Sequence, residues 1–588
     1  MRRNEEVALL LENIAELLKI KNENPYRIRA YETAAQNIRA LEEDIAELAA
    51  RGKLDEIPGV GQAIAAKIQE YLETGRLQFY EELKREVPIQ AVDLLEVPGI
   101  GPARAHLLYE KLGITTIQQL LEAAQAHKLC KLPGFGEKLE ERIAREAARL
   151  MQRTKRLLLG VALPVAEAVV EALRQVPAVR EIDPAGSLRR MKETIGDIDI
   201  LVGSERPQEV VDTFIRLPMV KEVLAVGPTR PSILTREDLQ VDLRVVHPDE
   251  YGSALLYFTG SKEHNIALRT LVQERGWKLS EYGLFDESGE RLASRTEHEI
   301  YALLGMDWIP PELRENRGEI QAALAHRLPK LVEQREIRGD LHAHTDWSDG
   351  HDSLERMVQA AVARGYEYLV ISDHSPSLTV ARGLTPERLR EQRRLIDELN
   401  ERYAPFRILQ GAEVNIHPDG SLDYPDEVLA ELDVVIVSVH SAFDMPSERM
   451  TERVVRALSN PHVDILGHPT GRLLNARLPY EIDLDAVLDA AAEYGVAIEV
   501  NGQPDRLDLP DIWVQRAIAR GIVIACTSDA HSTRQLDNMR WSVATARRGW
   551  AEARHVLNTR SHGELVAWLA EHRERRARPL GSRCRTTR

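Results

Sequence analysis

The sequence predicts a multidomain protein with a helical N-terminal part, a mixed α+β middle part and a C-terminal parallel β/α barrel. Apolar residues recur at helical spacing through residues 1–150. Short β-type runs alternate with helices beyond this point, and after Ile337 apolar β runs alternate regularly with helix-like segments. A chain of 588 residues has room for several domains with separate cores.

Composition excludes several classes of protein. The chain is 43% hydrophobic and 29% charged, as in globular proteins of aqueous compartments. No apolar run approaches the roughly 18 residues of a membrane helix, and no signal peptide precedes the first amphipathic pattern. Cys130, Cys526 and Cys584 are too widely spaced for a disulfide framework or a cysteine metal site. We therefore expect a cytoplasmic protein without a membrane partner.

The net charge of −16 is unusual for a nucleic-acid-binding protein, whose contact surface is normally basic. Metal-binding carboxylates would account for part of this acidity. Any DNA contact must then be local, through backbone amides and a few arginine and lysine side chains.

A short element recurs three times in the helical part, as Ile57-Pro58-Gly59-Val60-Gly61, Val97-Pro98-Gly99-Ile100-Gly101 and Leu132-Pro133-Gly134-Phe135-Gly136. Each copy leads into a helix, such as 63–72 or 137–151. Paired glycines allow a tight turn, after which the first N–H groups of the helix can bind a phosphate oxygen. This is the helix-hairpin-helix pattern, and its repetition favours DNA-backbone binding through Gly59, Gly61, Gly99 and Gly101. The third copy is equally compatible with a plain helix connector.

Carboxylates mark the strands of the middle part. We expect strands at 178–182, 198–202 and 241–245. Asp197 and Asp199 are two residues apart and so project from one face of the sheet, and Asp242 supplies a third carboxylate. Such convergent oxygens are what a two-metal phosphoryl-transfer site requires.

Gly186-Ser187-x-Arg189-Arg190 with Asp197-x-Asp199 resembles the nucleotidyltransferase motif of the family X DNA polymerases. The resemblance implies an α+β palm over 154–248. Gly186, Ser187 and Arg190 would then hold nucleotide phosphates, and the aspartates would hold two Mg²⁺ ions. Asp242 would also help to deprotonate the primer 3′-hydroxyl.

Tyr257-Phe258-Thr259-Gly260-Ser261 resembles the nucleotide-selection segment of the same family, in a thumb over 249–316. By this resemblance Tyr257, Phe258, Gly260, Asn265 and Arg269 would contact the nucleotide or the template strand. A core aromatic patch is the alternative for Tyr257-Phe258. Lys262-Glu263-His264 departs from the family pattern and leaves fidelity open.

Residues 1–85 resemble the family's lyase domain, and 86–153 would form the fingers-like hairpin domain. Lys67 aligns with the Schiff-base lysine, although Ala63 replaces a usual second lysine, so a phosphate-contacting role is the alternative. The family's hairpins also bind Na⁺ or K⁺ through carbonyl groups, here those of Asp55, Ile57, Val60, Leu95, Val97 and Ile100.

Beyond an expected linker at 317–335, apolar runs at 369–372, 434–438, 463–466, 496–500 and 522–525 predict the parallel strands of the barrel. Histidines and carboxylates follow these runs, where such barrels carry their chemistry. Imidazole with carboxylate suits Mn²⁺ or Zn²⁺.

Residues 336–570 resemble a PHP domain with a (β/α)7-type barrel. The resemblance implies three metal sets: His342, His344, Glu413 and Asp529; Glu413, His440 and His468; and Asp349, His374 and His531. The arginine-rich segment 571–588 is expected to be a disordered tail.

Together these resemblances imply a family X DNA polymerase that fills short repair gaps with dNTPs on gapped or primer–template DNA, acting as a monomer. The barrel would be a 3′–5′ exonuclease that could also process 3′-phosphates or abasic sites. Two alternatives stay open: a DNA-end-binding scaffold with an inert barrel, and a template-independent nucleotidyltransferase.

Overall fold

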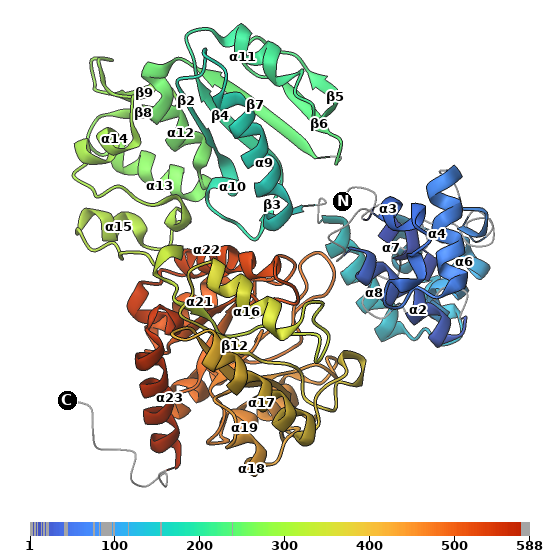
Figure 1. Cartoon of the computed structure of the whole chain (residues 1–588). Coiled ribbons are helices and arrows are strands. Elements are labelled where there is room, and N and C mark those ends of the chain that lie inside the picture. The colour runs from blue at the N-terminus through green and yellow to red at the C-terminus, as the bar shows by residue number, and fades with distance from the viewer. Residues whose placement is uncertain are drawn as a thin grey trace. The chain divides into compact units, whose positions relative to one another are not determined.

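The computed structural model (Figure 1) divides the chain into two compact units, residues 1–154 and 155–588. It describes residues 23–39, 45–74, 77–80, 102–115, 117–152, 156–237 and 239–577, with isolated residues in 4–18 and 83–100. Among these residues no helix is both long enough and apolar enough to cross a membrane.

The first unit is helical. Its helices are α2 (Pro25–Arg39), α3 (Ile45–Ala50), α4 (Gln62–Thr74), α6 (Pro102–Leu112), α7 (Ile117–Gln125) and α8 (Glu137–Gln152). One core includes Ile38, Ile57 and Ile68, and a second includes Leu108 and Phe135. Each core contains apolar residues of the hairpin turns, so the turns are anchored by packing against the helices.

The three hairpin turns share one hydrogen-bond pattern. The N–H groups of Val60, Ile100 and Phe135 each donate to the carbonyl three residues earlier, at 3.0, 2.9 and 3.1 Å. Gly59 and Gly134 have φ of +78° and +79°, a left-handed conformation that glycine adopts without strain. The third copy therefore has the backbone of the first. Gly99 and Gly101, predicted to bind DNA, and Leu95 lie outside the described residues.

The second unit begins with the palm, a five-stranded sheet in the order β2-β4-β7-β6-β5. Only the β4–β7 pair is parallel. The strands are β2 (Glu181–Pro184), β4 (Ile198–Gly203), β5 (Val220–Ala225), β6 (Ser232–Thr235) and β7 (Gln240–Val246). A small second sheet pairs β1 (Leu157–Leu158) with β3 (Thr194–Ile195). β2 starts later than its expected position because residues 176–179 form a turn, in which the Val179 N–H donates to Val176.

Alternation along the central strands decides which face carries the polar residues. Ile198, Ile200 and Val202 pack under α9 (Leu159–Arg174) and α11 (Pro207–Phe214). Leu201 packs on the other face under α12 (Tyr251–Thr259). Because side chains alternate along a strand, Asp199 shares the α12 face with Leu201.

The thumb follows, with α13 (Lys262–Gln273), β8 (Lys278–Ser280), β9 (Gly283–Phe285), β10 (Arg291–Ala293) and α14 (Glu297–Leu303) around one core. The segment 317–335 expected as a linker is partly folded onto this core, since it contains α15 (Glu319–Leu324). The buried carboxylate of Glu319 accepts a hydrogen bond at 2.7 Å from His264, which fixes this helix to the thumb.

The C-terminal barrel has seven parallel strands in sequence order, β11 to β17. They are β11 (Gly339–Asp340), β12 (Tyr368–Ile371), β13 (Arg407–Asn415), β14 (Val434–Ser438), β15 (Ile465–Leu466), β16 (Ala497–Asn501) and β17 (Ile524–Thr527). A bridge between Ala343 and Ala530 joins the segments that follow the first and last strands. The helices around the strands are α16 (Leu354–Ala363), α17 (Pro386–Arg402), α18 (Asp426–Leu429), α19 (Ser447–Leu458), α20 (Leu484–Tyr494), α21 (Asp511–Ala519) and α22 (Met539–Arg548). The predicted fold class, helical hairpin domains followed by an α+β palm and thumb and a (β/α)7-type barrel, is confirmed.

The start of the expected tail is also folded. Helix α23 (His562–Ala577) packs Leu565, Trp568 and Leu569 against residues of the barrel strands. The Arg573 guanidinium donates to the buried Asp464 carboxylate at 2.5 Å, so the first arginine of the tail is a structural residue. Residues 578–588 lie outside the described part.

Candidate active sites

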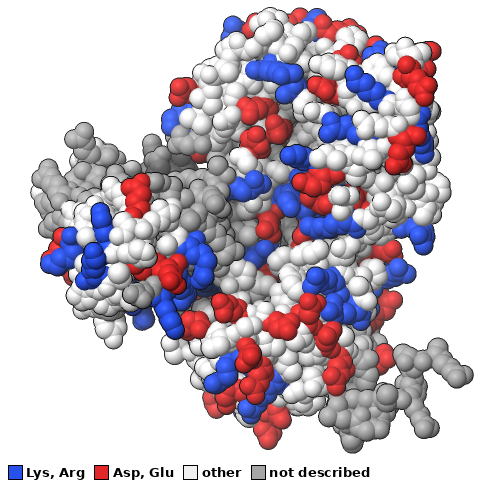
Figure 2. Space-filling model, turned by 180° about the vertical axis from the view of Figure 1, so that it is seen from behind, with Lys and Arg blue, Asp and Glu red and all other residues white. Residues whose placement is uncertain are grey.

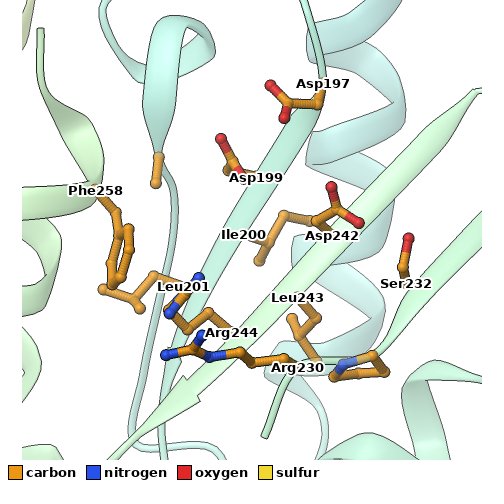
Figure 3. Close-up of a pocket in the computed structure, with 12 residues that line it drawn as sticks. Asp197, Asp199, Ile200, Leu201, Arg230, Ser232, Asp242, Leu243, Arg244 and Phe258 are labelled. Atoms are coloured by element: carbon orange, nitrogen blue, oxygen red, sulfur yellow. The ribbon is translucent and has the colours of Figure 1, made fainter. Parts of the chain in front are cut away.

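Three carboxylates converge on the palm sheet (Figure 3). Asp199 on β4 and Asp242 on β7 are direct partners in the parallel pair, and Asp197 lies just before β4. One oxygen from each of the three lies within 4.8 Å of the others. They line a cavity of about 310 Å³ with Arg230, Arg244 and Phe258. The structure thus brings the three predicted catalytic residues together where they line this cavity on the sheet.

Burial and like charges alter the central carboxylate. Burial, together with the charges of Asp197 and Asp242, raises the pKa of Asp199 to about 7. A divalent cation would relieve this repulsion, so the three carboxylates fit the two-metal role.

Arg244 lies on the same face of β7 as Asp242. Its positive charge partly offsets the repulsion between the carboxylates at Asp199. Its guanidinium lies 4.0 Å from the ring centroid of Phe258, a cation–π contact. Sequence reasoning did not include Arg244, although its position two residues after Asp242 predicts the same face.

The Gly186–Arg190 loop lies against these carboxylates. Gly186 has φ +59°, and a Cβ there would lie 2.6 Å from the Asp199 Oδ2. Gly186, Ser187 and Arg189 belong to the short helix α10 (Gly186–Arg189), and Arg190 is the C-cap residue of this helix. Only glycine permits this approach of the backbone to the carboxylates.

Arg190, the predicted phosphate ligand, is held within the unit. Its Nε donates to Glu315 at 3.0 Å and its Nη1 donates to the Thr259 carbonyl at 2.5 Å. A Cβ on Gly260 would lie 3.1 Å from this guanidinium. The loop and the nucleotide-selection segment therefore meet at Arg190.

The remaining predicted nucleotide contacts form one chain of interactions. The rings of Tyr257 and Phe258 meet edge to face with centroids 5.1 Å apart, and Tyr257 is 37% exposed. Asn265 donates to the Tyr257 carbonyl at 2.8 Å, and Arg269 donates to the Asn265 carbonyl at 3.3 Å. An exposed aromatic next to a hydrogen-bonding amide and an arginine suits contact with a nucleotide.

His264, which departs from the family pattern, has a structural role. Its ring is fully buried between the Glu319 carboxylate at 2.7 Å and the Tyr301 hydroxyl at 3.0 Å. His264 therefore offers no contact to the nucleotide pocket, whereas Lys262 and Glu263, the other two residues of the departure, are exposed.

Lys67 lies on α4 beside the first hairpin. Its ammonium group donates to the Ala63 carbonyl at 3.2 Å and lies 5.0 Å from the Phe79 ring centroid. Burial and the neighbouring Arg27 lower the pKa of Lys67, which favours the neutral amine that a nucleophile needs.

The barrel brings all nine predicted ligands to the carboxyl ends of its strands. Glu413 on β13 is the central residue. Its oxygens lie 3.4 Å from His342, 3.5 Å from His344, 3.1 Å from His440 and 2.8 Å from His468.

The other candidate ligands lie around Glu413, where the closest group of this residue and His440 includes His374 rather than the expected His468. Asp529 lies 3.3 Å from His344 and 3.7 Å from His342. Asp349 lies 3.3 Å from His374 and 3.5 Å from His531. The sets overlap more than expected, because His344 also reaches the set of Asp349 and His374 also reaches Glu413.

The donor atoms fit metal ions. Buried ring nitrogens of five of these histidines lack a hydrogen-bond partner, although buried polar atoms normally have one. They belong to His342, His344, His374, His440 and His468. Metal coordination would satisfy these nitrogens, and imidazole with carboxylate suits Mn²⁺ or Zn²⁺.

Burial and neighbouring charges shift the pKa values of the candidate ligands. Burial lowers the pKa of His440 to about 4, which keeps it neutral and able to bind a metal. Burial also opposes the charged form of His531, yet Asp349 and Asp529 raise its pKa to about 9. Histidine charges hold the pKa of Glu413 well below its usual range despite its burial.

Sequence reasoning missed Glu499, which supports the ligands from β16. Its carboxylate lies 2.6 Å from His342 Nδ1 and accepts hydrogen bonds from the His468 backbone at 2.5 Å and the Thr527 hydroxyl at 2.7 Å. Such a contact engages Nδ1 and would leave Nε2 of His342 as the ring nitrogen available to a metal ion. A single carboxylate inside the apolar run 496–500 was the available signal.

Four family models match parts of the chain. The Helix-hairpin-helix domain matches residues 2–77, and the SAM-like Helix-hairpin-helix tandem matches 91–149, which includes the third hairpin. The DNA polymerase beta thumb matches 254–315 and the PHP domain matches 340–503.

Individual relatives agree with these matches. The DNA polymerase/3′-5′ exonuclease PolX of Bacillus subtilis (strain 168) is 40% identical over 96% of this chain and 99% of its own length. DNA polymerase lambda of Arabidopsis thaliana is 27% identical over 45% of this chain and 53% of its own. A probable phosphatase of Thermoanaerobacter sp. (strain X514) is 31% identical over 40% of this chain and 96% of its own. The near-complete match to the first relative, with both halves folded as described, shows that the chain belongs to the family X DNA polymerases that carry a PHP domain.

Proposed function

We propose that this chain is a repair polymerase that fills short gaps by two-metal nucleotidyl transfer in the palm and trims 3′ ends in the barrel. The observation that carries the proposal is the presence of two complete ligand sets in one chain. Three carboxylates converge in the palm. In the barrel eight candidate ligands form overlapping groups, and His468 joins them through Glu413 at 2.8 Å. In an inert barrel these buried ring nitrogens would stay without hydrogen-bond partners, which is rare for buried polar atoms.

In the palm, the chain binds and orients the reacting groups. Asp197, Asp199 and Asp242 would hold two Mg²⁺ ions, which supply charge stabilisation for the transferred phosphoryl group. Asp242 would accept the proton of the primer 3′-hydroxyl. The guanidinium of Arg190, released from Glu315, and the Gly186–Ser187 backbone would bind the β and γ phosphates of a dNTP, for which a planar fork is suited.

In the barrel, the nine ligands would hold up to three Mn²⁺ or Zn²⁺ ions, which supply an activated water for phosphodiester cleavage. Glu413 and Asp529 contribute negative charge, and neutral His440 contributes a ring nitrogen. Glu499 keeps His342 in one orientation. Among these ligands the most accessible are Asp349 at 33% and His531 at 25% exposure, and a 3′ terminus would enter at this edge of the site.

DNA is held chiefly by the helical unit. Figure 2 shows basic and acidic side chains interspersed over one face of the molecule, without one continuous basic surface. Backbone amides of the hairpins, with Na⁺ or K⁺ at carbonyls such as those of Ile57 and Val60, give local phosphate contacts that such a surface permits. Gapped or primer–template DNA is the proposed partner, with the protein acting as a cytoplasmic monomer.

Two variants test the separate sites on one gapped duplex. Asp199→Ala should abolish dNTP incorporation and keep 3′-end degradation, because Asp199 contacts both proposed Mg²⁺ ions. His344→Ala should do the reverse, and Mn²⁺ should restore the nuclease better than Mg²⁺ after chelation. Asp212→Ala on α11 and His462→Ala, at the opposite end of the barrel, serve as matched controls. Loss of both activities in either site variant, with folding retained, would contradict separate sites.

A second activity of the barrel is removal of a terminal 3′-phosphate. The resemblance of this half to probable phosphatases over 96% of their length favours it. An oligonucleotide ending in 3′-phosphate should lose inorganic phosphate in wild type but not in His344→Ala. Release only of nucleotides would restrict the barrel to exonuclease action.

A further inference from the structure

Helix α22 of the barrel places an arginine against the phosphate-binding loop of the palm. The side chain of Arg548 is 3% exposed and lies at the last position of this helix. Its Nη1 donates to the main-chain carbonyl of Arg190 at 2.5 Å. Its Nη2 donates to Glu315 at 3.1 Å and to Asp511 at 2.6 Å. One guanidinium from the barrel thus contacts the palm loop, the end of the thumb and helix α21.

Glu315 is the shared partner in this group. Besides Arg548 it binds Arg190 through Nε at 3.0 Å, and Lys192 lies 3.9 Å away. Glu315 is 11% exposed, so water solvates its carboxylate only weakly and the charge depends on these cations. A triphosphate that binds Arg190 must therefore compete with Glu315 for the guanidinium.

We propose that Arg548 is a positioning residue for the nucleotide site: it fixes the Arg190 backbone and neutralises Glu315, so that the Arg190 side chain can turn to phosphate. The inference rests on the proposed phosphate role of Arg190. Through Arg548 the barrel would contribute to nucleotide binding in the palm, although α22 carries none of the proposed metal ligands.

Loss of Arg548 has two physical consequences. The Arg190 carbonyl loses a charge-assisted donor, which loosens the loop. Glu315 then binds Arg190 more strongly, because one of its other cations is gone. Both effects weaken nucleotide binding more than they slow the chemical step, so KM for the dNTP rises while kcat changes little.

Steady-state gap filling at varied dNTP concentration tests this with the full chain and Mg²⁺. Arg548→Ala should raise KM about tenfold, as expected for one buried charge-assisted contact. Arg547→Ala is the matched control. Arg547 precedes Arg548 on α22 and also joins the barrel to neighbouring segments, through Glu312 at 2.7 Å and the Val332 carbonyl at 2.9 Å. Within the described part of the chain the hydrogen bonds of Arg547 go to neither Arg190 nor Glu315, so the KM of Arg547→Ala should stay near wild type.

Further variants separate the possible failures. Arg190→Ala must itself raise KM; if it does not, the proposed phosphate role of Arg190 is at fault. If Arg190→Ala raises KM and Arg548→Ala behaves like Arg547→Ala, the positioning role is overturned.

A double variant tests the route through Glu315. In a Glu315→Ala background, Arg548→Ala should add much less than its single effect, because contacting residues are energetically coupled. Full additivity would overturn action through Glu315. If Arg548→Ala fails to fold, Arg548→Lys keeps the charge without the planar fork and should raise KM by a smaller factor. An unchanged KM in the folded lysine variant, with an unchanged response to the Glu315 substitution, would also overturn the proposal.

Discussion

Asp199 determines how the palm site responds to pH. Its folded-state pKa of about 7 is far above the ordinary value of a carboxyl group, because of burial and the charges of Asp197 and Asp242. Below this pH a proton occupies the carboxyl group in the metal-free protein. Above it the ionised form is present but repelled, so this group lowers the stability of the metal-free fold as the pH rises through about 7.

Metal binding should have the opposite dependence. A divalent cation requires ionised Asp199, so binding releases a proton at low pH and affinity rises until the pH exceeds about 7. Titration calorimetry with Mg²⁺ at about pH 6 and about pH 8 measures this, with proton release read from buffers of different ionisation enthalpy. The His344→Ala background reduces the contribution of the barrel. Equal affinity and no proton release at both values would contradict the argument.

Lys67 is the residue whose chemistry the structure leaves most open to experiment. Burial and Arg27 lower its pKa, so a larger fraction of the amine is neutral and able to attack an aldehyde. A borohydride-trapped adduct with a 5′-deoxyribose-phosphate end should form in wild type and vanish in Lys67→Ala. We expect a faint adduct, because Ala63 supplies no second cation for the phosphate.

Lys53→Ala is the control for this experiment, since Lys53 lies near the same hairpin but is paired with Glu56 at 3.0 Å. It should keep the adduct. Absence of an adduct in wild type would restrict the first domain to DNA binding.

At the scale of elements, hairpin geometry makes a prediction about DNA affinity. Gly59 has φ +78°, and a Cβ there would lie 2.8 Å from the Thr33 side chain. Gly59→Val should therefore distort the turn and move the amides away from phosphate. Fluorescence anisotropy on gapped duplexes should show a loss of affinity that is similar for every DNA sequence, since backbone contacts do not specify.

Gly113→Val is the control for the hairpin. Gly113 also has positive φ, +63°, but it follows α6 outside the hairpin turns and nothing lies within 4 Å of its added Cβ. It should keep more affinity than Gly59→Val. A loss that depends on DNA sequence would indicate base readout instead.

Elements and ligands were predictable wherever local pattern decides them. The i, i+2 spacing of Asp197 and Asp199 and the histidines at strand ends follow from the two-residue repeat and from barrel geometry. Strand starts such as that of β2 were less predictable, because a turn at 176–179 competes with pairing. The folding of 317–335 depends on a contact between His264 and Glu319, distant residues that no local pattern relates.

The same limit applies to supporting residues. Glu499 and His342 are 157 positions apart, and Arg548 and Arg190 are 358 apart. Each contact depends on the complete fold of the second unit. A single sequence points to candidate metal ligands by residue type, but it does not identify the residues that orient them.

At the scale of the second unit, the palm and the barrel share a core. Leu507 and Trp541 of the barrel are buried in the same cluster as the palm residues under α9. A Cβ added to Gly160 would lie 2.5 Å from the Pro504 side chain, so helix and barrel loop are in direct contact there. The loop that holds Pro504 also contacts the proposed metal ligand Asp529, since Gln503 donates to its carbonyl at 2.5 Å. Palm packing and barrel metal binding therefore involve one segment.

A shared core predicts that the two activities are lost together on heating. Trp541 is only 6% exposed. Trp541→Ala removes this buried side chain and should lower the free energy of unfolding by about 3–5 kcal/mol. Gap filling and 3′-end degradation, assayed after brief heating, should decline over the same, lower temperature range in this variant. Arg540→Ala, the neighbouring substitution on α22, removes the half-exposed pair with Glu167 and a cation–π contact 4.4 Å from the Trp541 ring centroid. It keeps the Trp541 side chain in the core and should cost less than Trp541→Ala, about 1–2 kcal/mol. If Trp541→Ala shifted heat inactivation of one activity and left the other unchanged, the palm and the barrel would be independent folding units, and control of the nucleotide site by the barrel would lose its structural basis.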